Sequence, residues 1–443
     1  MSIGHRILFV TPPPYLPNRL HRMRSFDLIR ILAKKHKVHL VSVTTKTKEP
    51  PEFAEIKKVC KSVKIIYLNP LKAILNCLRL PFLPAEVAYC YSPKATKEIQ
   101  KIIQRENIDV VYLKRLRSAI YLCDSTDSTS KESRSLPRHL RGDYNRMMIL
   151  DSTDAMSMFY FRMYKHAEFP KKLFYFLEAV RYRRFEKIIM ERIKNWIVCS
   201  EIDQKYLQRL RSDVNIHVVQ NTVDTDYFSR LKYLSLRGPR ASRGGRSNLK
   251  NREIASLLEV ARNDIPHSLL FRGLMDKPVN IDACLFFVKE ILPKVKQDIK
   301  DVKLFIVGPN PHRLIRKLHN EKDIFVTGFV KDVREFIEKT NISICPVRIG
   351  AGTRHKILQA WALSRPVVST TTGAEGLLYK KDKNIAIADS REEFAKEIIS
   401  LLKNRRKYDK LALNGRRTAV KYYSFKAVGQ KLETIIRNVK SLK

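Results

Sequence analysis

The sequence predicts an α/β protein built from two Rossmann-like βα domains. Short apolar runs alternate with segments of helical periodicity along most of the chain. The alternation stops near the midpoint, at the polar and basic residues 237–252, and then starts again. Such alternation is typical of parallel strands joined by crossover helices. A chain of 443 residues, 44% of them hydrophobic, is also long enough to build two cores.

The first domain is predicted to span residues 1–230. Helices are expected near 19–35 and 93–106. Residues 124–147 are rich in Ser, Thr and Arg, have no apolar period, and are expected to form an exposed insertion. The predicted strands, in chain order, are Ile7–Val10, Val38–Val43, Val63–Tyr67, Val110–Leu113, Met148–Leu150, Trp196–Cys199 and His217–Val219.

A basic linker is predicted at 231–255, followed by a second domain at 256–420 and a C-terminal helix at 421–443. We expect this helix to pack back toward the N-terminal domain. The two domains are expected to face a central basic cleft, since ligands of such sheets bind outside the carboxyl ends of the strands. The strands predicted in the second domain are Ser268–Phe271, Lys303–Val307, Ile324–Thr327, Ile342–Cys345, Val367–Ser369 and Ala386–Ala388.

The charge balance predicts an anionic partner. The chain has 86 Lys and Arg against 44 Asp and Glu, a formal net charge of +42. A nucleic acid, a membrane surface or a phosphorylated ligand would each satisfy that excess.

The seven cysteines and the apolar runs indicate where in the cell the protein is expected. The cysteines are scattered without a CxxC pair, which indicates reduced thiols in a cytosol. Ile7–Val10 is too short for the core of a signal peptide. The most apolar stretch, 71–89, is interrupted by Lys72, Arg79 and two prolines and is too broken to span a bilayer. We therefore expect a cytoplasmic protein, soluble or peripheral on the inner face of the cell membrane.

Residues 348–377 carry the clearest chemical signal. Gly350 and Gly352 allow the backbone to approach a ligand, and a helix is predicted to start near Arg354. Free N–H groups at a helix start favour an anion, and Arg354 and Lys356 add two charges there. A second loop of small residues, Thr371–Gly376, follows the next strand. The alternative, in which the glycines only make turns and the cations only face solvent, stays open.

This segment resembles the donor-binding motif of family 4 glycosyltransferases, also called glycosyl transferases group 1, which have the GT-B fold. It is most similar to the branch associated with exopolysaccharide clusters, with its G-x-G-T/I-x-x-K-I/V-L-E-A run followed by P-V-V and G-A-E-G-L. The resemblance extends, in the same order as in the family, to residues 6–43, 197–207, 218–228, 271–293, 303–309 and 324–337.

The resemblance implies an enzyme that moves a sugar from a nucleotide-sugar donor to a saccharide or lipid-linked acceptor. It implies a hexosyltransferase-like reaction with retention, no metal, no cofactor beyond the nucleotide-sugar co-substrate, and a role in cell-surface polysaccharide biosynthesis. Arg354, Lys356, Asp151 and Asp154 are the implied catalytic residues. The implied donor-binding residues are Gly273, Lys277, Gly350, Gly352, Thr353, Gln359, Gly373, Ala374, Glu375 and Gly376.

Three departures from the family pattern stand out. Gln359 and Ala351 occupy the positions of a frequent pair of glutamates, so a ribose contact from Gln359 would carry no charge. Thr222 replaces the glycine of the N-G-V-D loop. The family's histidine after the fifth strand is missing, and Asp151 or Asp154 could instead orient an acceptor hydroxyl. A cap on the following helix is the alternative for Asp154.

Two basic segments leave further alternatives open. The helix at 171–194 could lie on an anionic membrane surface, or could be a core helix with a solvated basic face. Arg19, Arg22 and Arg24, after the prolines at 12–14, either face the ligand or form an ordinary basic helix face. Two rival functions remain: a catalytically degenerate GT-B protein, and a basic nucleic-acid-binding protein. No nucleic acid is expected, because the cations are spread along the chain without a recognition motif.

Overall fold

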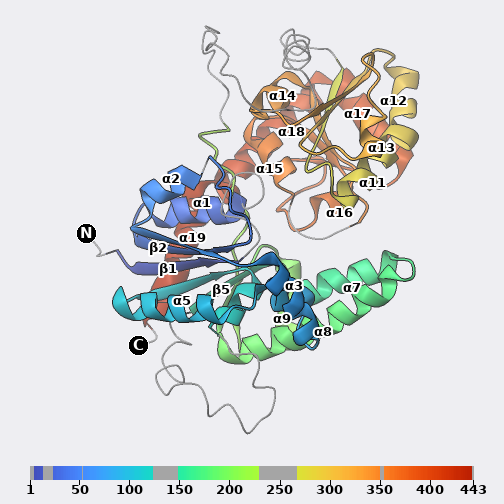
Figure 1. Ribbon diagram of the computed structural model, residues 1–443. Helices are drawn as coiled ribbons and strands as arrows, with labels where there is room; N and C mark the ends of the chain where they lie inside the picture. The colour runs from blue at the N-terminus through green and yellow to red at the C-terminus, as the bar shows by residue number, and fades with distance from the viewer. Residues whose placement is uncertain are drawn as a thin grey trace. The chain divides into compact units, whose positions relative to one another are not determined.

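A computed structural model describes residues 4–12, 23–51, 53–122, 148–228, 267–349 and 354–441. The chain divides into two compact units (Figure 1). Unit 1 comprises Met1–Thr222 together with Phe425–Lys443, and unit 2 comprises Val223–Ser424. The predicted insertion at 124–147 and the predicted linker at 231–255 lie outside the described residues.

Unit 1 is built on a parallel sheet of seven strands in the order β3-β2-β1-β4-β5-β6-β7. The strand order reverses direction between β1 and β4, so the carboxyl ends of these two central strands lie at a topological switch point. The strands are β1 Arg6–Thr11, β2 Lys37–Thr44, β3 Ser62–Tyr67, β4 Val110–Lys114, β5 Met148–Thr153, β6 Asn195–Val198 and β7 Asn215–Val218. The last two begin earlier than predicted, because the ladder already pairs Asn195 with Asn215.

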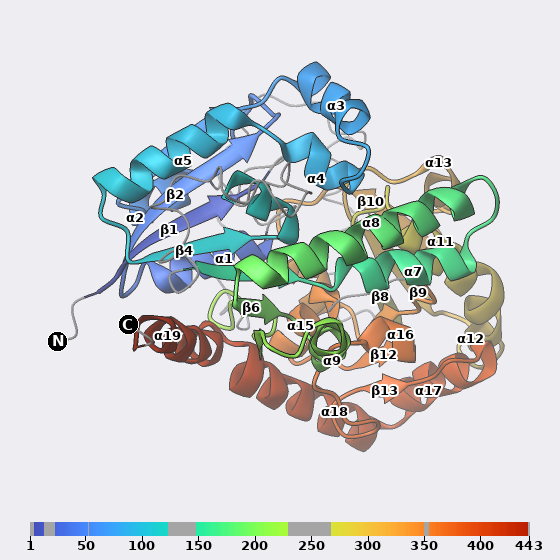
Figure 2. The ribbon, with the colours of Figure 1, turned by 90° about the horizontal axis from the view of Figure 1, so that it is seen from below.

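Helices cover both faces of this sheet, which explains why the central strands β1 and β4 are buried along almost their whole length. Ile7 and Phe9 pack on one face, against α1 (Met23–Leu32), α2 (Phe53–Val59) and α19 (Phe425–Ser441). Leu8 and Val10 pack on the other face, which Figure 2 shows crossed by α5. The helices of that second face are α4 Ala85–Cys90, α5 Pro93–Arg105, α8 Lys171–Arg192 and α9 Glu201–Leu210.

Three further elements complete the described part of unit 1: α3 (Pro70–Arg79), a 3₁₀ helix at Leu116–Tyr121, and α7 (Met156–His166), which packs along α8. Asn69 caps α3, since its Oδ1 accepts hydrogen bonds from the N–H groups of Leu71 and Lys72. None of the helices in the described ranges has the length and apolarity needed to cross a bilayer.

Unit 2 contains a second parallel sheet, of six strands in the order β10-β9-β8-β11-β12-β13. The strands are β8 Ser268–Arg272, β9 Lys303–Val307, β10 Ile324–Gly328, β11 Ile342–Cys345, β12 Val367–Ser369 and β13 Ala386–Ile387. One continuous hydrophobic core joins this sheet to its helices. The helices are α11 Pro278–Phe286, α12 Leu292–Asp298, α13 Arg313–Arg316, α14 Arg334–Lys339, α15 His355–Ala362, α16 Thr371–Ala374, α17 Arg391–Lys403 and α18 Arg405–Thr418, with π-helical turns at Phe287–Ile291 and Ala419–Tyr423.

Candidate functional site

Three cationic side chains lie near one another in unit 2. Arg272 ends β8, Arg354 immediately precedes α15, and Lys356 is in its first turn. Burial lowers the pKa of Arg272 to about 10, and its buried Nε has no acceptor among the described residues. Burial, joined by the charges of Arg354 and Arg272, lowers the pKa of Lys356 to about 8. The two arginines thus make it more costly to charge Lys356, and a bound anion would favour its protonated form.

Neutral groups hold Lys356 in place. Its Nζ donates to Oδ1 of Asn280 at 3.0 Å and lies 4.3 Å from the ring centroid of Phe271. Asn280, on α11, also donates from Nδ2 to the carbonyl of Leu274 at 2.9 Å. The loop after β8 is thereby tied to the start of α15. An amide oxygen and an aromatic face orient the ammonium group without cancelling its charge.

Two predicted donor contacts, Gly273 and Lys277, lie in the loop after β8. A Cβ at Gly273 would come 2.7 Å from Nδ2 of Asn280, so only glycine allows that side chain its position. Lys277 immediately precedes α11, is 57% exposed, and has its Nζ 3.5 Å from the carboxylate of Asp276. Lys277 is therefore more exposed to solvent than Lys356, and the carboxylate of Asp276 partly neutralises its charge.

The other predicted contacts around α15 are only partly described. Gly350, Gly352 and Thr353 lie outside the described residues. Gln359 belongs to the run of buried residues on α15 and is 3% exposed. Its contact with a ribose stays a prediction.

The predicted loop Thr371–Gly376 is partly helical. Residues Thr371–Ala374 form the short helix α16, because Oγ1 of Thr370 caps it by accepting the N–H of Gly373 at 2.9 Å. A Cβ at Gly373 would lie 2.6 Å from the carbonyl oxygen of Cys345, so the turn packs directly on the end of β11. Ala374 is fully buried, and only Glu375 and Gly376, which has φ of +76°, follow the helix as a turn.

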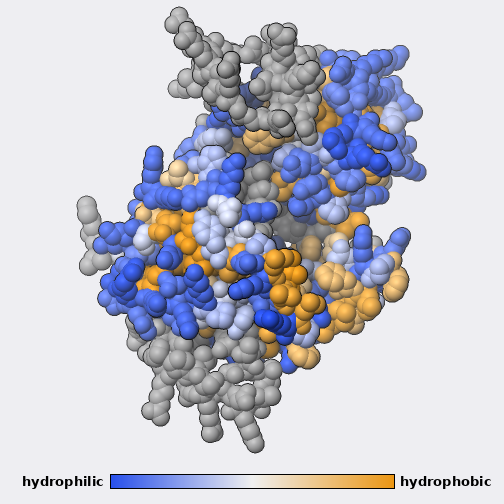
Figure 3. Space-filling model, viewed as in Figure 1, coloured by the Kyte–Doolittle hydropathy of each residue, from blue (hydrophilic) through white to orange (hydrophobic). Residues whose placement is uncertain are grey.

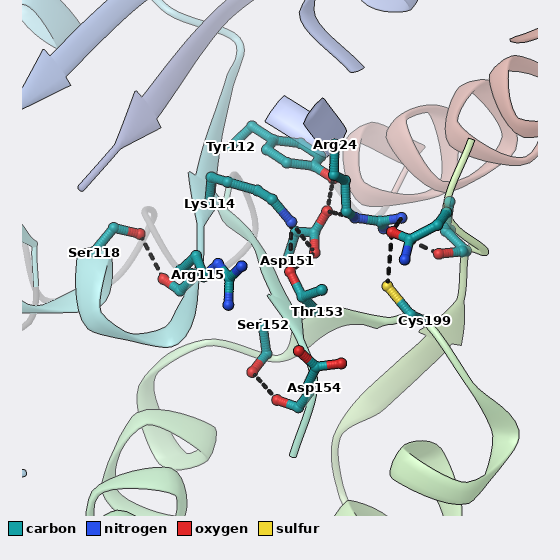
Figure 4. A network of polar contacts seen from close by, with 12 residues as sticks. Arg24, Tyr112, Lys114, Arg115, Ser118, Asp151, Ser152, Thr153, Asp154 and Cys199 are labelled. Carbon is teal, nitrogen blue, oxygen red and sulfur yellow. Dashed lines mark hydrogen bonds and ion pairs between the residues drawn. The ribbon is translucent and has the colours of Figure 1, made fainter. Parts of the chain in front are cut away.

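A buried polar network lies near the carboxyl ends of β4 and β5 in unit 1, beside the topological switch point (Figure 4). Asp151 on β5 is at its centre and is fully buried. One carboxylate oxygen accepts from the hydroxyl of Tyr112 at 2.7 Å and from Nε of Arg24 at 3.0 Å. The other accepts from Nζ of Lys114 at 2.8 Å and from the hydroxyl of Thr153 at 3.3 Å. Contact with an acceptor would require one of these donors to be displaced.

The charged groups of the network influence one another's pKa values. Although burial opposes ionisation, Arg24 and Lys114 hold the pKa of Asp151 below its usual range. Burial lowers the pKa of Lys114 to about 7 despite the nearby carboxylate. Arg24 is 5% exposed and also donates to the carbonyls of Val219 and Gln220. Neither interpretation of Arg24 as a ligand-facing or solvated cation is correct, and Arg19 and Arg22 lie outside the described residues.

Two strands end beside this network with strained backbone. Arg115 follows β4 with φ of +71°, and Thr153 ends β5 with φ of +75°, an uncommon value for a β-branched residue. Such strain concentrates at functional sites. Asp154 comes next and is partly exposed. It is not the cap of α7, because Ala155 occupies that position.

Sequence reasoning missed four residues of these two clusters: Arg272, Asn280, Tyr112 and Lys114. Arg272 and Lys114 each stand directly after an apolar run that was predicted as a strand. Because ligands of parallel sheets bind at the carboxyl ends of strands, this position was a usable signal. Asn280 and Tyr112 carried no such signal, since their roles depend on partners distant in the sequence.

Comparison with solved structures identifies the fold. HepE of Anabaena, solved in complex with UDP, superposes with a TM-score of 0.62 over 98% of this chain and 100% of its own, at 12% identity. Sucrose-phosphate synthase from Thermosynechococcus elongatus superposes with a TM-score of 0.67 over 99% of this chain and 100% of its own, also at 12% identity. The chain therefore has the GT-B fold, as predicted.

Comparison at the sequence level narrows the class within that fold. Residues 266–404 match the family model described as glycosyl transferases group 1. An uncharacterised 44.6 kDa protein in the cps region of Klebsiella pneumoniae is 26% identical over 155 residues, which are 33% of this chain and 40% of that protein. The chain thus matches less than half the length of this relative. The resemblance to group 1 glycosyltransferases is confirmed, and the family model places it in unit 2.

Proposed function

We propose that the protein transfers a sugar from a nucleotide-sugar donor. The observation that carries the proposal is the group of three cations, Arg272, Arg354 and Lys356, at the carboxyl end of β8 and the start of α15. Negative charge grows on the leaving diphosphate as the bond to the sugar breaks. Fixed cations therefore stabilise the transition state more than the ground state.

Each group around this site has a separate task in the proposal. Arg354 and Lys356 bind the diphosphate, and Arg272 adds a third charge from the next strand. Asn280 and Phe271 orient the Lys356 ammonium, as their contacts with Nζ support. Gln359 contacts the ribose and Glu375 the transferred sugar.

The acceptor is proposed to be a saccharide or a lipid-linked saccharide, used in cell-surface polysaccharide biosynthesis. The relative in the cps region of Klebsiella pneumoniae supports this setting. The structures of HepE with UDP and with UDP-glucose support a nucleotide-sugar donor. A hexosyl group is proposed to be transferred with retention. Asp154, which is partly exposed beside the strained end of β5, orients the acceptor hydroxyl, while Asp151 positions that strand end.

We further propose that the reaction needs no metal and takes place in the cytoplasm, on or near the inner face of the membrane. The cations of unit 2 would neutralise the diphosphate in place of a metal ion. The described cysteines, none of which forms a disulfide, support a reducing compartment. Full activity after treatment with a chelator is the expected result. A loss of activity that added Mg²⁺ or Mn²⁺ restores would contradict metal independence.

The test is a thermal-shift screen of the whole protein against a panel of nucleotide sugars, followed by turnover assays with those that bind. A ligand that binds the native state raises the unfolding temperature with its occupancy. Stabilisation that is lost in a combined Arg354→Ala and Lys356→Ala variant supports the site. Binding without any turnover would identify a catalytically degenerate protein. No binding to any nucleotide sugar, with steeply salt-dependent binding to DNA, would overturn the proposal.

A further inference from the structure

Helix α3 of unit 1 exposes a row of large apolar side chains. Leu71, Ile74, Leu75 and Leu78 are between 45% and 75% exposed, and Phe82 in the following turn is 78% exposed. Their spacing places the four helical residues along one side of α3. Only Ala73 of this helix is buried. The first part of the stretch 71–89 therefore forms α3, whose large apolar side chains are exposed in the structure.

A second apolar row lies on the N-terminal half of α8 and the residue before it. Phe169 is 81% exposed, and Leu173, Phe174, Phe176, Leu177 and Val180 are between 42% and 53% exposed. The C-terminal half of the same helix differs, because Phe185, Ile189 and Met190 are buried in the core. The helix for which a membrane surface and a core position were the alternatives is thus divided: the large apolar side chains of its second half lie in the core, and those of its first half are exposed.

A buried carboxylate connects the two rows. Glu178 of α8 is fully buried, and its Oε2 accepts the backbone N–H of Ala85, the first residue of α4, at 2.9 Å. Its Oε1 accepts from Arg181 at 2.9 Å. Helix α4 in turn contacts α3, and Sγ of Cys77 donates to the carbonyl of Ala85 at 3.4 Å. Figure 3 shows hydrophobic side chains gathered over α3 and over the ends of α7 and α8.

We propose that residues 71–82 and 169–180 form one interfacial surface, by which unit 1 docks on an anionic lipid bilayer. Two amphipathic helices lying in the interface bury their apolar faces among the acyl chains while cations meet the headgroups. Lys72, Arg79, Lys171 and Lys172 are all exposed within or beside the two rows. Residues 70–84 contain no acidic side chain, and Glu168 is the one exposed carboxylate beside Phe169.

Charge selects a lipid surface over a second copy of the chain. A symmetric dimer through this surface would bring the same four cations face to face, at a cost in free energy. An anionic leaflet attracts each of them instead. The docking extends the proposed function, because a lipid-linked acceptor would be presented at the same bilayer. The contact with lipid itself does not depend on that function.

The first experiment measures co-sedimentation of the whole protein with vesicles of phosphatidylcholine containing one-quarter phosphatidylglycerol. The apolar variant combines Leu78→Gln, Phe82→Gln, Phe169→Gln and Leu173→Gln. We expect its partition coefficient to fall by about ten-fold or more, since each side chain loses its transfer into the acyl region. The matched control combines Leu314→Gln, Phe329→Gln, Leu413→Gln and Val420→Gln, which are between 42% and 57% exposed in unit 2, and should bind like the wild type.

The second experiment separates the charge contribution. Replacing Lys72, Arg79, Lys171 and Lys172 with Gln should weaken binding by about five-fold per residue at low salt. The same charge change at Lys34, Lys35, Lys37 and Lys58, which are exposed elsewhere on unit 1, should have a much smaller effect. Equal losses in both variants would mean that net charge alone drives binding, and would overturn the proposed surface.

The third experiment reports insertion directly. Both native tryptophans, Trp196 and Trp361, are fully buried, so an indole introduced by Phe82→Trp is read against a protected background. Brominated lipids should quench it, and should not quench the indole introduced by Phe329→Trp. Absence of quenching, or a dimer in light scattering that the apolar variant dissociates, would overturn lipid docking. Nucleotide-sugar thermal shifts should persist in the docking variants, which keeps this proposal separable from the donor site.

Discussion

The three cations of unit 2 show how the pKa of a side chain depends on its neighbours. A lysine in water is fully protonated at neutral pH, whereas burial and two nearby cations lower the pKa of Lys356 to about 8. The hydrogen bond to Asn280 and the ring of Phe271 keep the ammonium in position. In the proposed donor site the ammonium group is therefore held in position before an anion binds, which is the condition under which fixed charges contribute most to catalysis.

Removing one of these charges should affect the chemical step more than binding. We expect Arg354→Ala or Lys356→Ala to lower kcat by roughly 10²-fold, with a smaller rise in KM, because the diphosphate gains charge only as the bond breaks. Lys381→Ala, at an exposed lysine of unit 2, is the control and should change neither constant. Steady-state kinetics with a verified donor is the measurement, and a wild-type kcat in both variants would remove these residues from the site.

Donor affinity should also depend on pH through Lys356. A bound diphosphate favours the protonated lysine, so its dissociation constant should rise as pH increases through about 8, where the free enzyme loses that proton. Lys356→Arg keeps the charge and should flatten this dependence. Calorimetric titration with a non-hydrolysable donor between neutral and alkaline pH would measure it, and identical profiles for both proteins would contradict the assignment.

Asp151 is expected to contribute chiefly to stability. Both its oxygens are occupied by donors inside unit 1, and two of those donors are buried cations. Asp151→Asn would leave Arg24 and Lys114 buried without their counter-charge, at a cost of about 3 to 5 kcal/mol in the free energy of unfolding. Asp154→Asn, three residues further along the chain and partly exposed, should cost little stability but lower kcat. Urea unfolding and steady-state kinetics of the two variants would separate the two roles.

Among the elements, α8 shows two environments along one helix. The large apolar side chains of its first half are exposed, whereas Phe185, Ile189 and Met190 of its second half are buried in the core of unit 1, and the helix packs along α7. In that second half Glu186 is fully buried, where its carboxylate accepts the N–H and the hydroxyl of Ser157 on α7. Burial raises the pKa of this carboxyl to about 7, so the pair of helices is held by a group that is only partly ionised at neutral pH.

The packing of α7 on α8 should therefore weaken as pH rises. The unfolded chain releases the Glu186 proton at a pKa of about 4.5, whereas the native protein retains it up to about 7. Native Glu186 thus binds more protons in this window, and its contribution to the free energy of unfolding should fall by about 3 kcal/mol across it. Glu186→Gln should remove this contribution to the pH dependence of the urea midpoint. A variant whose pH profile is parallel to that of the wild type would contradict the pKa.

At the scale of the whole molecule, unit 1 is assembled from two separate parts of the chain. Helix α19 lies in unit 1 although more than 200 residues of unit 2 precede it in the sequence. Its residues Val428, Leu432 and Ile436 are fully buried in the core that also contains Ile7 and Phe9. His36 of unit 1 and Glu433 of the same helix add a hydrogen bond of 2.9 Å.

Truncation after Ser424 should accordingly destabilise unit 1 and spare the proposed donor site. Loss of three buried aliphatic residues alone should cost several kcal/mol, about 2 or more for each. We expect the unfolding temperature of unit 1 to drop, while nucleotide-sugar binding in unit 2 remains. Differential scanning calorimetry with and without ligand would resolve the two transitions. An unchanged thermogram after truncation would show that the helix contributes nothing to unit 1.

The sequence by itself determined the fold class and most strand positions. Runs such as Lys303–Val307, Ile342–Cys345 and Val367–Ser369 were predicted with the bounds that the structure has. A strand buried on both faces must be apolar throughout, so its position is written in a short local stretch. The segment around Arg354 and Lys356 was equally visible, because the helix start and its cations are neighbours in sequence.

Only the tertiary structure decided what depends on distant partners. Tyr112, Asp151 and Arg24 come from three separate segments, and nothing in any one of them indicates that the carboxylate is fully buried. The contact of Asn280 with Lys356 spans 76 positions. The same holds for the exposed apolar residues of α3 and α8. From the sequence they could equally have belonged to the core, and only the folded structure shows that they do not. Burial is a property of the folded chain, since a side chain's environment is set by residues that local sequence does not contain.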